Sequence, residues 1–184
     1  MFQASTATAA PSDEAAAGGR FAELYDAHAL GAVRLAYLLT GDRELAEDIA
    51  QDAFIKVVGR FHDLRHRDAF GAYLRIAIVN LVRSHFRRRK LERAHVASER
   101  ARVARGDDQP PDIAGRDALR RALLALPVRQ RAAVVLRYFE DLSEQQTGDA
   151  LGCSPAAVKA LVARAMETLR RPEHLSTLQD GRTR

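Results

Sequence analysis

The apolar residues of the first ninety positions recur at intervals of three and four, the period of an amphipathic helix. One helix is predicted between Phe21 and Leu39, and Thr40-Gly41 ends it. Asp42 can cap a second helix, and a third runs from about 69 to 90. The apolar positions of the second helix are Leu45, Ile49, Ala53, Val57 and Phe61.

A second block of helices follows position 115. Between about 91 and 115 the apolar pattern decays. The first part of this stretch can extend the third helix as a charged segment, whereas GDDQPPD (106–112) cannot and indicates a linker. Asp117 is the predicted cap of a short helix that ends near Leu126. Ser143 and Gln146 then form a capping-box pattern, and Ser154-Pro155 restarts a helix after Gly152. Two helices joined by a short turn with glycine predict a helix-turn-helix.

These patterns predict an all-α protein with two small helical domains joined by a flexible linker. No segment alternates with period two for long enough to predict a strand. The expected divisions are a disordered N-terminal arm at 1–19, a first domain at 20–91, a linker at 92–115, a helix-turn-helix domain at 116–171 and a C-terminal tail at 172–184.

Composition narrows the class of protein. The chain has 184 residues, a formal net charge of +5 and a pI near 9.9, a balance that favours a polyanionic partner. Its single cysteine, Cys153, excludes an internal disulfide, and the N-terminal stretch lacks the basic start and apolar block of a signal peptide. No apolar run approaches the roughly 18 residues that span a bilayer. We therefore expect a cytoplasmic protein without membrane insertion.

The positive charge is concentrated at the end of the third predicted helix. Residues 73–93 contain seven basic side chains and one acidic side chain. A basic helix end complements the helix dipole, which explains two or three of these charges. It does not explain why Asn80 shares a stripe with the arginines. A membrane-surface helix would need a bulky apolar face opposite the charges, and here that face is needed for the core. Nucleic acid is the favoured partner of this stripe: Asn80, Arg83, Ser84, Arg87 and Arg88.

The second predicted helix is acidic, in contrast to the basic end of the third. Five acidic residues and one arginine lie between 42 and 52. Asp48, Gln51, Asp52 and Ile55 are spaced three and four apart and so share one face. A solvated acidic face and a protein-binding face explain this spacing equally well.

The helix-turn-helix has a second helix suited to DNA. Its predicted inward face is Val158, Leu161, Val162, Ala165 and Leu169. Small side chains near its start allow close entry into the major groove, and Lys159 and Arg164 can reach phosphates or guanine edges. DNA binding is favoured over a solvated face on an interaction domain.

Catalytic patterns are weak, so we expect no enzyme, no metal and no cofactor. His62 and His66 are spaced as i and i+4, but they lie among arginines without a metal-binding helix motif. Asp48 and Asp52 have no further candidate ligand, and Cys153 is expected to be a small packed residue.

Four stretches together resemble a known family: AEDIAQDAFIKVV (46–58), AYLRIAIVNLVRSHFRRRK (72–90), LPVRQRAAVVLRYFEDLSEQQTGDALGCS (126–154) and AVKALVARAMETLR (157–170). They resemble, in order and spacing, the extracytoplasmic-function (ECF) sigma factors, small two-domain members of the sigma-70 superfamily of bacterial RNA polymerase subunits. LLTGD (38–42) is similar to an actinobacterial branch. The resemblance covers about residues 20–171.

The resemblance implies a role for each matching position. The motif that docks on the polymerase clamp matches Asp48, Gln51, Asp52 and Phe54, and the helix that engages the −10 element matches Asn80, Arg83, Ser84, Arg87 and Arg88. The loop that captures a flipped base matches Phe61, His62, Arg65 and His66. The module that reads the −35 element matches Arg131, Ser154, Ala157, Lys159, Ala160 and Arg164.

The implied function is promoter recognition and DNA opening as a sigma factor. The implied partners are core RNA polymerase, through its clamp and flap elements, promoter DNA and, as often in the family, an anti-sigma factor. The alternative is a stand-alone helix-turn-helix repressor that dimerises through its first block. Tyr73 stands where the family commonly has Trp, and Ala160-Leu161 stand where it commonly has Ser-Arg. Thr147-Gly148 replace a common Ile-Ala, which predicts a looser first helix of the helix-turn-helix.

Overall fold

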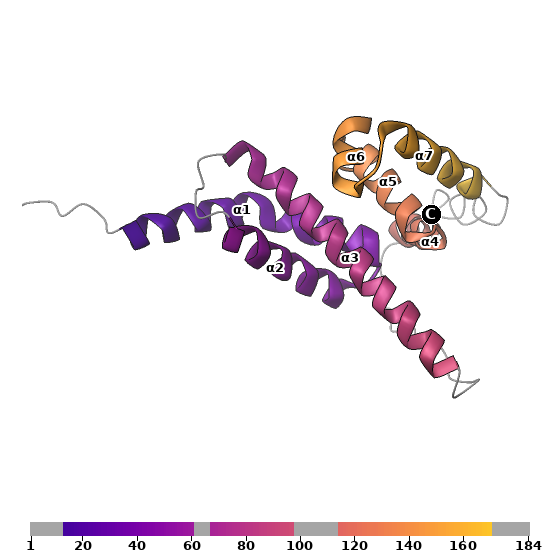
Figure 1. Ribbon diagram of the computed structural model, residues 1–184, viewed down its shortest axis with the longest axis horizontal. Helices are drawn as coiled ribbons and strands as arrows, with labels where there is room; N and C mark the ends of the chain where they lie inside the picture. Colours follow the sequence, from indigo (N-terminus) through magenta and orange to yellow (C-terminus); the bar gives the residue numbers. More distant parts are fainter. Residues whose placement is uncertain (1–12, 61–66, 98–113, 171–184) are drawn as a thin grey trace, which may run out of the picture.

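The computed structural model describes residues 13–60, 67–97 and 114–170, and all regular structure within these ranges is helical. The helices are α1 (Asp13–Thr40), α2 (Arg43–Arg60), α3 (Arg67–Ala97), α4 (Ala114–Ala125), α5 (Val128–Tyr138), α6 (Glu144–Leu151) and α7 (Pro155–Leu169). Helices α1 to α3 pack into an elongated bundle, and α4 to α7 form a compact group beside it (Figure 1). The prediction of an all-α fold is confirmed for the described residues.

Local capping explains where α2, α6 and α7 begin. Asp42 accepts a hydrogen bond from the backbone N–H of Leu45 at 3.0 Å, as expected of the N-cap of α2. Ser143 and Gln146 form a complete capping box on α6. Ser154 accepts from the N–H of Ala157 at 3.2 Å, and Pro155 occupies the first turn of α7.

Three predicted boundaries need correction. Helix α1 begins at Asp13, inside the expected arm, because alanine-rich sequence (14–17) supports helix and outweighs two glycines. Helix α3 continues to Ala97, into the expected linker, because residues 91–97 contain no proline or glycine. Helix α4 begins at Ala114, so Asp117 lies within the helix rather than at its cap. The rest of the predicted arm, GDDQPPD (106–112) and the tail from 172 lie outside the described residues.

The first helix of the helix-turn-helix is tightly packed, not loose as predicted. Thr147 and Gly148 are buried within α6. A Cβ atom at Gly148 would lie 2.6 Å from the carbonyl oxygen of Cys153, in the turn that leads to α7. Glycine at this position therefore allows the turn to approach α6 closely.

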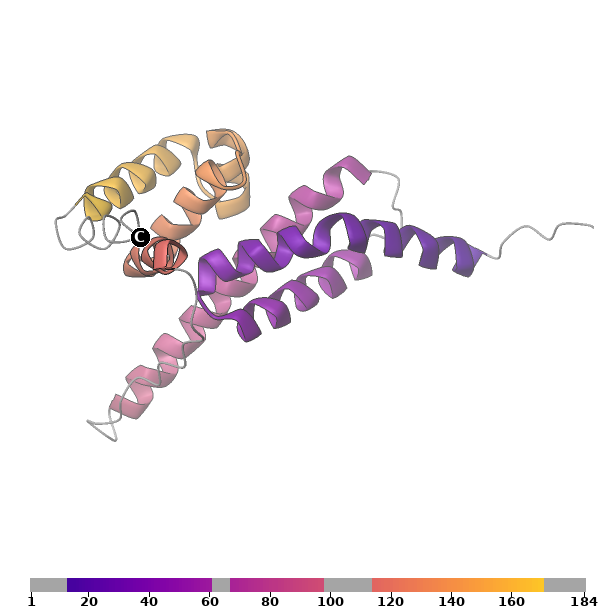
Figure 2. The same cartoon turned by 180° about the vertical axis from the view of Figure 1, so that it is seen from behind.

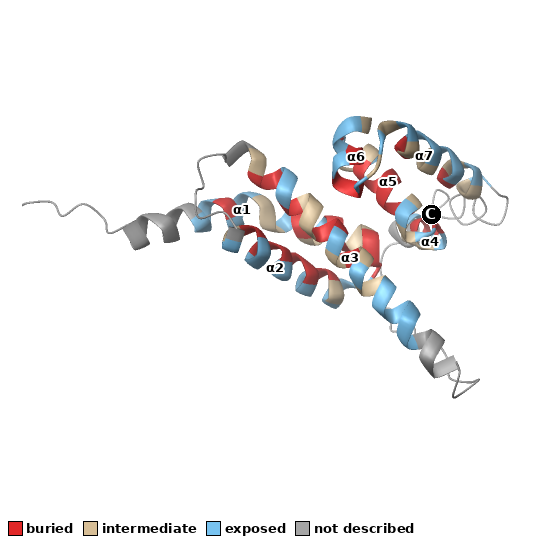
Figure 3. Cartoon of the chain, in the orientation of Figure 1, coloured by how far each residue is buried: buried red, intermediate tan, exposed pale blue. Residues whose placement is uncertain are grey.

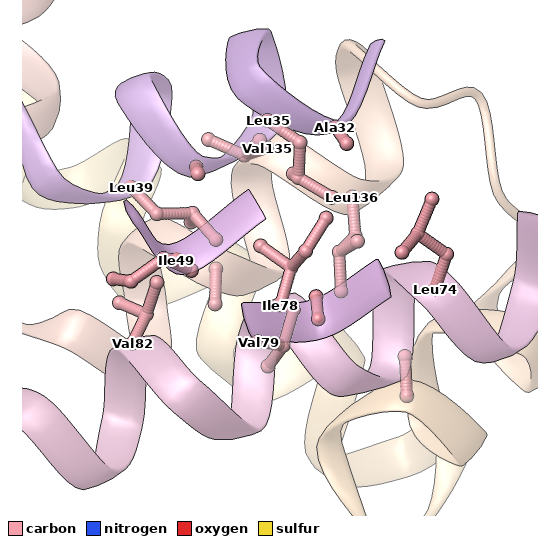
Figure 4. Packing of buried hydrophobic residues seen from close by; sticks show 14 of the residues in the cluster. Ala32, Leu35, Leu39, Ile49, Leu74, Ile78, Val79, Val82, Val135 and Leu136 are labelled. Carbon is pink, nitrogen blue, oxygen red and sulfur yellow. The ribbon is translucent and has the colours of Figure 1, made fainter. Parts of the chain in front are cut away.

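One hydrophobic core runs through both groups of helices. Val135 and Leu136 of α5 belong to the same cluster as Leu35 of α1 and Ile78 of α3 (Figure 4). All four side chains are almost completely buried. The two groups are therefore packed together by apolar side chains and do not merely touch at their surfaces.

Candidate nucleic-acid interface

The basic stripe lies on one face of α3, and the opposite face of this helix packs into the core. Ile78, Val79 and Val82 are buried, whereas Asn80 is exposed. Towards its C-terminus α3 extends beyond the neighbouring helices, and its surface there is exposed (Figure 3). The structure places most of the predicted −10 residues on this accessible surface: Asn80, Ser84, Arg87 and Arg88.

Arg83 is the exception within the stripe. Its side chain is half-buried, and its Nη1 donates a hydrogen bond to the carbonyl oxygen of Leu151, at the end of α6, at 3.2 Å. The second group of helices therefore covers part of the predicted DNA-binding stripe.

His85 adds no positive charge to the end of α3 at neutral pH. Burial lowers the pKa of His85, and repulsion from Arg89 and Arg88 lowers it further. The ring packs edge-on against Phe86, with 5.6 Å between ring centroids. The positive potential here comes from the arginines and Lys90.

The acidic stripe of α2 is fully accessible. Asp48, Gln51, Asp52 and Ile55 are all exposed, and Ile55 is 63% exposed. Ile55 is the one large apolar side chain among the four residues of this stripe. The spacing alone had placed Ile55 on this face, although the family motif directed attention to Phe54 instead.

Phe54 needs correction as a candidate contact. It is only 3% exposed, and its ring lies 4.9 Å from that of Tyr25 and 5.9 Å from that of Phe70, centroid to centroid. Six residues after Asp48, it points away from the acidic stripe and into the core. Phe54 therefore supports α2 from within and does not present itself to a partner.

The recognition helix has the arrangement that the sequence predicts. Val158 and Ala165 are buried, whereas Lys159, Ala160 and Arg164 are exposed. Ser154 is occupied as the cap of α7, and Ala157 is half-buried beside it. Lys159 Nζ lies 3.4 Å from Glu144 Oε2 of α6, an exposed ion pair that links the two helices.

Arg131, predicted to contact DNA, is 5% exposed and bound at the interface between the two groups. Its guanidinium donates to the carbonyl oxygens of Leu39 and Leu126 and lies 5.6 Å from the centroid of the Phe86 ring. Burial lowers the pKa of Arg131 to about 10. It stays protonated at neutral pH but is not accessible to DNA in this arrangement.

Other predicted features fall outside these surfaces. The base-capture residues Phe61, His62, Arg65 and His66 lie outside the described residues. Tyr73 is described and is 49% exposed on α3. Within the described ranges, no group of three or more His, Cys, Asp or Glu side chains could hold a metal ion. No helix in the described part of the chain is long and apolar enough to cross a membrane.

Together the fold and these surfaces define a class: a helical protein with a helix-turn-helix and a separate basic helix. Comparison with known protein families identifies the family within this class. Residues 24–92, which contain α2 and most of α1 and α3, match the family model of sigma-70 region 2. Residues 116–169, covering nearly all of α4 to α7, match that of sigma-70 region 4.

Individual relatives agree. The chain is 36% identical over 138 residues to an RNA polymerase sigma-E factor of Streptomyces avermitilis, covering 75% of this chain and 76% of that protein. It is 33% identical over 157 residues to the ECF RNA polymerase sigma factor SigM of Mycobacterium tuberculosis, covering 84% and 79%. The chain belongs to the ECF sigma factors of the sigma-70 superfamily.

A solved structure supports the fold. The sigma factor RpoE of Bartonella quintana, in complex with the anti-sigma factor NepR, matches with a TM-score of 0.63 at 24% identity over 85% of this chain and 97% of that one. As a member of this family, the chain is a sigma factor for transcription initiation, which functions in promoter recognition and DNA opening. The matches do not favour the alternative of a stand-alone repressor.

Proposed function

We propose that this sigma factor uses two oppositely charged faces of its first domain for two partners. The acidic stripe of α2 docks on the clamp of core RNA polymerase, and the basic stripe of α3 binds the −10 element and its separated strand. The observation that supports this division most strongly is that the whole acidic stripe is exposed, together with every residue of the basic stripe except Arg83, on two helices that share one core. Polyanionic DNA is repelled by the first stripe and attracted by the second.

The second domain supplies the upstream contact in this proposal. Helix α7 enters the major groove at the −35 element, where Lys159 and Arg164 contact phosphates or bases and Ala160 allows close approach. The domain also contacts the polymerase flap. An anti-sigma factor is a further proposed partner, since the solved relative RpoE was crystallised with one.

The proposed DNA contacts make promoter binding sensitive to salt. Each phosphate that a lysine or arginine neutralises releases condensed counterions, so affinity falls as salt rises. Sigma factors as a family are DNA-binding initiation factors. We accordingly propose that this chain works in the cytoplasm with polymerase, needs no cofactor and catalyses no reaction itself.

Run-off transcription with core RNA polymerase on genomic DNA fragments tests the proposal. Discrete transcripts are expected only when the chain is added, and their start sites define the −10 and −35 elements. Absence of chain-dependent transcripts, together with tight binding of DNA without polymerase, would contradict it and favour a repressor.

A further inference from the structure

An ion pair joins the two helices of the helix-turn-helix at the start of α6. Lys159 Nζ of α7 lies 3.4 Å from Glu144 Oε2, and the lysine side chain is 69% exposed. Exposed ion pairs contribute little to stability, because water and salt screen both charges. The main consequence of this pair is therefore the position in which it holds the head group of the lysine.

Two local features fix where Glu144 lies relative to α7. The capping box of Ser143 and Gln146 defines the first turn of α6, in which Glu144 is the first residue. The close approach of Gly148 to the carbonyl oxygen of Cys153 fixes the turn between α6 and α7. The carboxylate of Glu144 is therefore held beside the second turn of α7 by the backbone geometry of the motif as well as by the ion pair.

The exposed face of α7 carries three alanines between two cations. Ala156, Ala160 and Ala163 are exposed and spaced four and three apart, so they form one line along the helix. Lys159 lies on one side of this line and Arg164 on the other, because each residue turns the helix by about 100°. Alanine side chains offer no hydrogen bond to a base edge. Near the start of α7, hydrogen bonds to base edges therefore depend on Lys159 and its partner.

This face of α7 is accessible in the described arrangement. Helix α7 lies along the outer side of the second group of helices, away from α1, α2 and α3, in the front view (Figure 1) and again from behind (Figure 2). The first residues of a recognition helix contact base edges in the major groove, and the helix before it crosses the DNA backbone. Lys159 is the fifth residue of α7, and Glu144 is the first of α6. In this docking geometry the pair lies where the base edges meet the backbone.

The chemistry of the pair matches one kind of base pair. In the major groove guanine offers the acceptors O6 and N7, and cytosine offers the donor N4–H₂. The ammonium of Lys159 can donate to guanine while the carboxylate of Glu144 accepts from the cytosine paired with it. We propose that Glu144 is a specificity-determining residue, which together with Lys159 reads one G·C base pair of the −35 element. The proposal rests on the proposed contact of α7 with that element and adds how one of its base pairs is read.

Glu144 also opposes an alternative contact of the lysine. An unpaired lysine beside the DNA backbone binds phosphate, a contact that carries no sequence information. The carboxylate repels phosphate and neutralises the lysine, so the pair gains less from nonspecific DNA than a free lysine does. Removing the carboxylate should therefore raise the affinity for DNA of any sequence and lower the discrimination between sequences. A residue that only supported the fold would not change these two quantities in opposite directions.

A promoter library tests the proposal with the intact holoenzyme. The template is a promoter mapped by run-off transcription, with its −35 element randomised and each version marked by a transcribed barcode. Core RNA polymerase with the full chain transcribes the pool, and sequencing of the RNA gives the base preference at each −35 position. The variants are Glu144→Gln and Lys159→Ala. The matched control is Asp149→Asn, which removes an equal charge from another exposed position of α6, where the carboxylate accepts a hydrogen bond from Gln145 at 3.0 Å.

The wild-type holoenzyme should prefer G·C at one position of the element by about 5- to 100-fold. Glu144→Gln should weaken that preference at least about threefold and leave the other positions unchanged. Lys159→Ala should weaken the preference at the same position, and the control should keep it. The Glu144→Gln holoenzyme should also bind a labelled duplex of unrelated sequence more tightly than wild type. The salt slope of that binding should be larger by about 1, because the freed lysine contacts a phosphate.

Unchanged base preferences in Glu144→Gln would overturn the proposal. So would an equal loss in the Asp149→Asn control, or losses at different positions in Glu144→Gln and Lys159→Ala. In each of these cases, transcripts that depend on the chain would leave the proposed function intact. If no template gives such transcripts, the proposed function fails and this proposal fails with it.

Discussion

The acidic stripe of α2 and the basic stripe of α3 have the same helical spacing but different surroundings. All four positions of the acidic stripe, from Asp48 to Ile55, face solvent. In the basic stripe, Arg83 is bound to the end of α6, whereas Arg87 and Arg88 are free of that contact. Spacing therefore determines which side chains share a face, and the arrangement of the domains determines whether that face is available. Only the acidic stripe is ready to bind a partner without rearrangement.

The largest expected effect is on stability, and it distinguishes the buried side of α2 from its exposed side. Phe54→Ala should lower the free energy of unfolding by about 3–5 kcal/mol, because it empties a site packed against two other rings. Ile55→Ala should change it by less than about 0.5 kcal/mol. Urea denaturation measures both. The reverse order would show that the two side chains had been assigned to the wrong faces.

The next effect concerns polymerase binding by the acidic stripe. Asp48→Arg with Asp52→Arg should weaken binding of core polymerase roughly 100-fold, since reversing charges at an interface both removes attraction and adds repulsion. Asp26→Arg, exposed on α1, controls for the effect of one charge reversal elsewhere. Fluorescence titration with labelled chain measures the affinity. If the double variant forms holoenzyme as well as wild type, the acidic stripe is not the docking surface.

A smaller effect is expected from the free part of the basic stripe. Arg87→Ala with Arg88→Ala should reduce strand opening roughly tenfold and lower the salt slope of promoter binding by about 2, one for each lost phosphate contact. Core polymerase binding should not change. Arg89→Ala with Lys90→Ala removes the same charge at the neighbouring positions and should have less effect. Permanganate reactivity of unpaired thymines measures strand opening. If both double variants lose strand opening equally, the arginines of the stripe act only through nonspecific electrostatic attraction.

The smallest effect is the pH dependence of domain closure. Burial raises the pKa of Glu140 from its ordinary value of 4.5, although Arg75, 3.8 Å away, and Arg34 lower it in part. If separation of the domains returns Glu140 to solvent, the closed state holds the proton more tightly than the open one. Protonated Glu140 then stabilises the closed arrangement fully at pH values below its ordinary pKa. This stabilisation is lost as the pH rises through the raised pKa of the closed state.

Acidification from pH 7.5 to 5 should therefore slightly increase energy transfer in the free chain between dyes on cysteines introduced at Asp26 and Glu167, both exposed, in a Cys153→Ser background. Glu140→Gln should reduce that increase while keeping the domains closed at neutral pH. An opening on acidification that disappears in Glu140→Gln would show that attraction by Arg75 and Arg34 outweighs the cost of burying the carboxylate.

Local signals made much of the molecule predictable. Capping residues such as Asp42, Ser143 and Ser154 placed helix starts correctly, since each acts within its own turn. The spacing of apolar residues likewise identified Val158 and Ala165 as the buried face of α7. Helix ends were less predictable where no proline or glycine stops the chain, as beyond residue 90 in α3.

Contacts between distant residues were not predictable. No local pattern indicates that Arg120 reaches the carbonyl group of Gly41, 79 positions away, or that Arg131 reaches that of Leu39. Phe54 was misassigned because a family motif identifies residues that matter without saying whether they face a partner or the core. The available signal was helical spacing. Phe54 comes six residues after Asp48 and so lies on another face of α2, whereas Ile55 comes seven residues after it and lies on the same face.

Site-specific photo-crosslinking shows directly whether the two stripes contact different partners. A photoreactive amino acid placed at Gln51 of α2 or at Ser84 of α3, both exposed, reports what each stripe touches within one promoter complex. Position 51 should crosslink to a polymerase subunit, and position 84 should crosslink to promoter DNA near the −10 element. Crosslinking of both positions to the same partner, or an exchange of the two partners, would contradict the proposed division between the acidic and the basic stripe.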